Sequence, residues 1–132
     1  MIKKRFLETS GFREFFQSLS DFDKKNVKKI IEKIRERVEY NILKPDSFLR
    51  YEFAGTRKER RERLRVFYRV CEECRRLGHD KIEGRCHDCP REDDIICLIW
   101  GDDIRDDETY KDKTMLDRPG AKIDKRSNEF CE

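Results

Sequence analysis

One short apolar run sets the expected centre of the fold. Residues 95–100 are six consecutive apolar residues in a chain that is 46% charged and 36% hydrophobic. A strand with apolar side chains on both faces is typical of the middle of a sheet, because both of its faces are covered. We therefore expect 95–100 to form a central strand that Gly101 ends. With 132 residues and few apolar side chains, the chain is expected to form one domain around one modest core.

Two amphipathic helices are predicted before that strand. Residues 2–8 are expected to form a short strand, and Ser10 then has the character of a helix N-cap. Apolar residues at helical spacing indicate the first helix, namely Phe12, Phe15, Phe16 and Leu19. The second helix begins at 20–23 and ends at Pro45, because proline disfavours helix in the residue before it. Its apolar stripe, which we expect to pack in the core, consists of Val27, Ile30, Ile31, Ile34 and Val38.

Alternating residues predict a hairpin in the middle of the chain. Residues 48–54 and 63–70 alternate as strands do, and a polar turn is expected over 55–61. One face of the second strand carries Leu64, Val66, Tyr68 and Val70, and the other carries Arg63, Arg65, Phe67 and Arg69. The expected fold is α+β, with two N-terminal helices on one face of a twisted, mainly antiparallel sheet and arginines on the other. Residues 111–132 are expected to be a flexible polar tail.

The charges are segregated along the chain. The formal net charge is only +3, but residues 50–76 hold ten Lys and Arg against five Glu, and residues 92–112 hold nine acidic residues against two basic ones. Guanidinium groups suit phosphate, because they are planar, permanently charged and bidentate. The arginine-rich segment therefore indicates a nucleic-acid face, and a salt-bridged surface is the alternative. No run of 18 apolar residues predicts a membrane span, and no secretory signal is recognised. A cytoplasmic protein is expected.

Four of the six cysteines form two Cys-x-x-Cys pairs. Each pair can present two thiolates to one metal ion, and two pairs complete the tetrahedral site that zinc prefers. The predicted ligands of one structural zinc per chain are Cys71, Cys74, Cys86 and Cys89, and His79 or His87 could replace a cysteine. Two disulfides or a redox pair are the alternatives. Residues 71–89 would then form a zinc-ribbon-like hairpin, since so polar a loop needs the metal to fold.

The order of these motifs resembles the RelE/ParE superfamily of type II toxin–antitoxin toxins. The resemblance rests on the helix pair, the strand 64–70 with Arg65 inside it, the strand that ends at Gly101, and Tyr110. It covers residues 1–110 apart from the insertion 71–89. The RelE branch implies a metal-independent endoribonuclease, an mRNA interferase that cuts mRNA on the ribosome and is neutralised by a small antitoxin.

The resemblance also assigns roles to residues. Arg65 would stabilise the phosphate, and Tyr110 would act as acid, base or stacking ring. The other cationic catalytic candidates are Lys58, Arg61 and Arg105. Further contacts to RNA would come from Arg57, Arg60, Arg63, Arg69 and Phe67.

Two other functions stay open at this point. A ParE-like or inactive member would bind gyrase, an antitoxin or another target without cutting RNA, and a zinc-containing regulator would use the fold only as a scaffold. Convergence of the candidate cations on one concave face would favour the ribonuclease. Carboxylates from 102–108 that cap Arg65 would favour a binding function.

Overall fold

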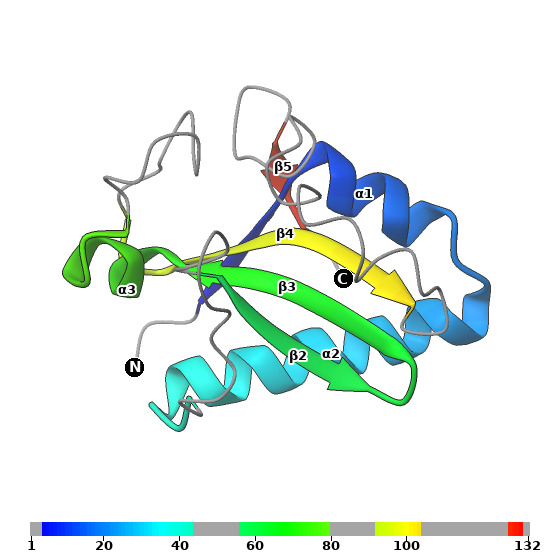
Figure 1. Ribbon diagram of the computed structural model, residues 1–132, viewed down its shortest axis with the longest axis horizontal. Coiled ribbons are helices and arrows are strands. Elements are labelled where there is room, and N and C mark those ends of the chain that lie inside the picture. The colour runs from blue at the N-terminus through cyan, green and yellow to red at the C-terminus, as the bar shows by residue number, and fades with distance from the viewer. Residues whose placement is uncertain (1–3, 44–55, 80–91, 104–126, 131–132) are drawn as a thin grey trace.

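The computed structural model describes residues 4–43, 56–79, 92–103 and 127–130. These residues form an α+β fold in which helices pack on a mixed sheet with the strand order β2-β3-β4-β1-β5 (Figure 1). In chain order, the elements are β1 (Arg5–Glu8), α1 (Ser10–Gln17), α2 (Asp21–Glu39), β2 (Arg57–Arg61), β3 (Leu64–Val70), α3 (Cys71–Arg76), β4 (Ile95–Asp103) and β5 (Asn128–Glu129).

Strand β4 is central, as its apolar sequence predicts. It pairs antiparallel with β3 and parallel with β1. The expectation that Gly101 ends the strand is wrong, because β4 continues to Asp103 and Val66 pairs with Gly101. The glycine has a packing role instead. A Cβ built at Gly101 would lie 2.1 Å from Cε2 of Phe15, so the ring of Phe15 occupies the space that any side chain would need.

The two N-terminal helices are confirmed, with small changes at their ends. Thr9, and not Ser10, caps α1: its hydroxyl accepts a hydrogen bond from the Phe12 amide at 3.0 Å and donates one to the Ile99 carbonyl at 2.7 Å. This second bond joins the helix start to β4. The second helix begins within 20–23 as expected, with Ser20 as its N-cap, but α2 ends at Glu39, well before Pro45. No helix in the described ranges is long and apolar enough to cross a membrane.

The core lies between these helices and the sheet. The predicted stripe of α2 is buried from Val27 to Ile34, and it packs with Phe12 of α1. From the sheet, the same cluster contains Phe6, Leu64, Val66, Tyr68, Val70, Ile96 and Leu98. The face of β3 that alternation assigned to the core is therefore confirmed.

The hairpin differs from its prediction. The polar turn expected over 55–61 is instead strand β2 from Arg57 onward, and its partner β3 follows after a two-residue connection. Glu62 in that connection has a φ of 55°, which a tight reversal between strands requires. The sequence Arg-Lys-Glu-Arg-Arg has no apolar alternation, so only its pairing with β3 makes it a strand. The strand predicted over 48–54 lies outside the described residues.

The end of the chain also departs from the expected flexible tail. Asn128 and Glu129 form β5, which pairs antiparallel with β1. Phe130 is 8% exposed, and its ring meets those of Phe12 and Phe16 edge-on at 5.9 and 5.4 Å. Residues 127–130 therefore belong to the folded domain, whereas the rest of the predicted tail lies outside the described residues.

Candidate functional site

Arg65, the central candidate, is held by a carboxylate. Its Nε and Nη2 donate hydrogen bonds of 2.8 and 2.6 Å to the two oxygens of Asp102, its cross-strand partner on β4. The two side chains are only 4% and 5% exposed. The guanidinium also lies 5.3 Å from the centre of the Phe67 ring. The fork that would grip a phosphate is therefore filled by Asp102.

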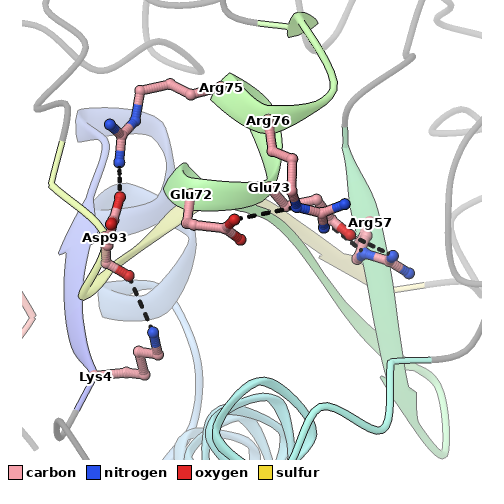
Figure 2. Close-up of polar contacts among 7 residues, drawn as sticks. All are labelled: Lys4, Arg57, Glu72, Glu73, Arg75, Arg76 and Asp93. Atoms are coloured by element: carbon pink, nitrogen blue, oxygen red, sulfur yellow. Dashed lines mark hydrogen bonds and ion pairs between the residues drawn. The ribbon is translucent and has the colours of Figure 1, made fainter.

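The other arginines of the hairpin also meet protein partners. Arg57 forms two hydrogen bonds, of 2.9 and 2.6 Å, with the Glu73 carboxylate, and the pair is 6% and 7% exposed (Figure 2). The Nε of Arg69 donates to the Thr56 hydroxyl at 2.9 Å, and Arg69 is 3% exposed. Phe67 is 2% exposed. The face predicted to offer arginines and an aromatic ring to RNA is thus largely buried.

Near the hairpin turn, the cations bind α2 and β4. Arg63 lies between two carboxylates, with Nη2 at 2.6 Å from Asp23 and Nε at 2.9 Å from Asp103. The Nε of Arg61 donates to the Asn26 side chain at 3.2 Å. A further bond closes the turn itself, from Arg60 Nε to the Glu62 carbonyl at 2.6 Å.

The catalytic candidates do not share one face of the sheet. Cross-strand partners lie on the same face, so Lys58 opposite Phe67 shares the face of Arg65. Arg61 pairs with Leu64 and reaches α2, so it lies on the opposite, helix-covered face. Lys58 is half-buried and makes no ion pair within the described part of the chain. Arg105 and Tyr110 lie outside the described residues.

The first cysteine pair lies on α3, directly after β3. Cys71 and Cys74 belong to a short helix, and residues three apart on a helix lie on the same side. Cys71 is 3% exposed and Cys74 is 8% exposed. Two buried thiols one turn apart fit two ligands of a zinc ion, whose preferred ligands include thiolates. The other predicted ligands, Cys86 and Cys89, and the alternative His87 lie outside the described residues. The described residues alone contain no group of three possible metal ligands. His79 is half-buried beyond the end of α3.

Ion pairs fix α3 to the neighbouring strands (Figure 2). Glu73, between the two cysteines, binds Arg57 of β2, and Arg75 binds Asp93 just before β4. Lys4 donates to the Asp93 backbone carbonyl at 3.0 Å, which links this corner to the start of β1. The position of the two thiols is therefore set by the sheet.

A second cluster of charges lies at the start of β1 and joins it to the residues just before β4. Arg5 binds both Glu92 and Asp94, and its Nε donates to Asp94 at 2.8 Å. This hydrogen bond, together with the nearby positive charge of Arg5, lowers the pKa of Asp94 below its usual value. Both acids come from the segment whose negative charge stands out in the sequence.

Sequence reasoning named carboxylates from 102–108 as possible caps of Arg65, and the structure identifies Asp102 as the one that binds it. It missed the pairing of Glu73 with Arg57, which neutralises a second buried arginine. The alternation of β3 contains a usable signal, because an arginine on a covered face needs a carboxylate opposite it. Asp102 lies opposite Arg65 only because β4 continues past Gly101 and pairs with β3 there. The sequence does not indicate this continuation.

Comparison of the chain with models of known protein families, with curated proteins and with solved structures finds no match.

Proposed function

We propose that this chain is a RelE/ParE-like protein that binds RNA on the ribosome without cutting it. The proposal is carried by the Arg65–Asp102 pair. A ribonuclease of the RelE type needs that arginine at the phosphate as negative charge develops there. In this structure the Nε and Nη2 of Arg65 instead donate hydrogen bonds to Asp102, at 2.8 and 2.6 Å.

The energy of the pair supports binding over cleavage. A phosphate that reached Arg65 would have to displace Asp102 and leave a carboxylate buried without its partner. Breaking a buried ion pair in this way costs about 3–5 kcal/mol. The separation of Arg61 from Arg65 by the sheet adds to this argument, because the two cations cannot act on one phosphate.

The fold supports the RelE/ParE-like part of the proposal. Two N-terminal helices precede the antiparallel strands β2, β3 and β4, which is the order that the resemblance implies. Within this proposal, one structural zinc held by Cys71, Cys74, Cys86 and Cys89 stabilises residues 71–89. The proposed partners are the ribosome and a small antitoxin, in the cytoplasm.

The test compares binding with cleavage. Purified protein is mixed with ribosomes that are translating a defined mRNA; co-sedimentation measures binding, and primer extension maps any cut. We expect co-sedimentation with an intact message, both for the natural protein and for Asp102→Asn. Codon-position cuts by the natural protein would contradict the proposal and favour the RelE-type ribonuclease. Cuts by Asp102→Asn alone would leave Asp102 as the block and would refute the argument from the separation of Arg61 and Arg65. Failure to sediment with ribosomes or bind RNA would also refute it.

A further inference from the structure

The exposed side of α2 carries lysines that the rest of the described chain does not neutralise. The segment 24–29 holds four lysines and no acidic residue, and Lys25, Lys28 and Lys29 are exposed. In the parts that the structure describes, these three lysines form no ion pair, whereas Arg57, Arg63 and Arg65 of the hairpin do. Among the described residues, positive charge without an acidic partner is therefore available along α2, in addition to that of Lys58, Arg60 and Arg61 on the hairpin.

Two aromatic rings lie at the ends of the same side of the helix. Phe22 is 67% exposed and Tyr40, which directly follows α2, is 62% exposed. They are eighteen residues apart, which is five full turns, so they share one side about 27 Å apart. Lys25, Lys29 and Lys33 lie within about a sixth of a turn of the line between them. We call these five residues the α2 lysine face.

One acidic residue shares this face. The Oε2 of Glu36 lies 3.9 Å from the Nζ of Lys33, and both side chains are more than half exposed. Such a surface pair contributes about 0–1 kcal/mol, so a stronger anion can compete for Lys33. Lys25 and Lys29 have no such competitor in the described ranges.

We infer that the α2 lysine face binds single-stranded RNA, an inference that rests on the proposed function above. Lysines along a track neutralise the phosphates, and exposed rings offer surfaces on which unpaired bases stack. A duplex fits less well, because its bases are stacked on one another and cannot reach Phe22 or Tyr40. The surface therefore matches an unpaired strand that runs along the helix from one ring to the other.

The experiment measures the anisotropy of a fluorescent single-stranded RNA as the full-length protein is titrated, at several salt concentrations. The test variant is Lys25→Ala/Lys29→Ala. Its matched control is Lys24→Ala/Lys28→Ala, which removes the same charge from the same helix but off the α2 lysine face. We expect the test variant to lower the salt slope by about 1.4, at about 0.7 per lost phosphate contact, and the control to lower it much less.

The rings are tested separately with Phe22→Ala and Tyr40→Ala. Each is expected to weaken binding by about 5- to 160-fold, the range that loss of one stacked base gives. Circular dichroism checks that every variant keeps its helix content.

Three results would overturn the inference while the proposed function stands: equal losses in the two lysine variants, unchanged binding in the test variant, or tighter binding of duplex than of single-stranded RNA. Absence of any RNA binding by the natural protein would overturn both.

Discussion

The buried Arg65–Asp102 pair makes a stability prediction whose size follows from its geometry. Asp102→Ala removes the carboxylate and leaves the guanidinium of a 3%-exposed residue without its main partner. We expect the free energy of unfolding to fall by about 3–5 kcal/mol, because the cost of burying the charge is no longer offset. That is a large part of the roughly 5–15 kcal/mol that stabilises a domain of ordinary size.

Two further variants separate this effect from a general effect of charge. Arg76→Ala breaks the Arg76–Glu72 pair on α3, whose side chains are 59% and 42% exposed, and should cost about 0–1 kcal/mol. Arg65→Met/Asp102→Leu removes both charges and fills the space with apolar atoms. This double variant should be about as stable as the natural protein, or more stable, because no charge is left buried.

Urea denaturation followed by Trp100 fluorescence measures all of these values, since Trp100 lies opposite Phe67 in the sheet. A loss below about 1 kcal/mol for Asp102→Ala would refute the reasoning, because it would place the pair in the range of surface ion pairs. Arg65→Ala should destabilise the fold in the same way, because it leaves the Asp102 carboxylate buried without its partner. A loss of activity in that variant would therefore not by itself identify Arg65 as a catalytic residue.

Gly101→Ala should destabilise the chain by about 1–3 kcal/mol, because the new methyl group meets the ring that covers β4, and an unchanged urea midpoint would contradict this packing. Phe130→Ala should cost about 3 kcal/mol by emptying an aromatic site, and native stability in that variant would show that the chain end is not part of the core. The pKa of Asp94 is lower in the folded protein than in the unfolded chain, because the ionised carboxylate binds Arg5. This ion pair therefore stabilises the fold at a pH above the unfolded-state pKa of Asp94, and the stabilisation is lost as the pH falls through the folded-state pKa. Melting temperatures from about pH 5 to 3 should therefore fall more for the natural protein than for Asp94→Asn, and parallel curves would argue against the pair. Elemental analysis should find about one zinc per chain, with a lower melting temperature after chelation or in Cys71→Ser; a metal-free protein indifferent to chelator would refute the site.

The elements with strong hydrophobic patterns could be predicted from the sequence. The apolar stripe of α2 predicts a helix packed on the core, and the apolar run in β4 predicts a central strand. The structure places both elements in this way. Alternation in β3 also assigned the correct face to the core. These features depend on local periodicity, which a sequence displays directly.

The features that depend on long-range pairing could not be predicted. Strand β2 exists because β3 offers hydrogen bonds to it, and its own charged residues give no sign of a strand. Phe130 is buried because β1 has an edge that the chain end can join. The capping of Arg65 depends on the register of two strands far apart in sequence, so the same arginine is consistent with a phosphate site until Asp102 is placed opposite it.

The most direct test of the account is the fate of an mRNA on ribosomes that carry this protein. Primer extension on a defined message, with the natural protein and with Asp102→Asn, reads cleavage at single-nucleotide resolution while co-sedimentation reads binding. The account predicts a bound protein and an intact message in both cases. Discrete cuts by the natural protein would contradict it, because they would show that Asp102 does not keep Arg65 from the phosphate. Cuts by Asp102→Asn alone would contradict the claim that the separation of Arg61 from Arg65 also prevents cleavage.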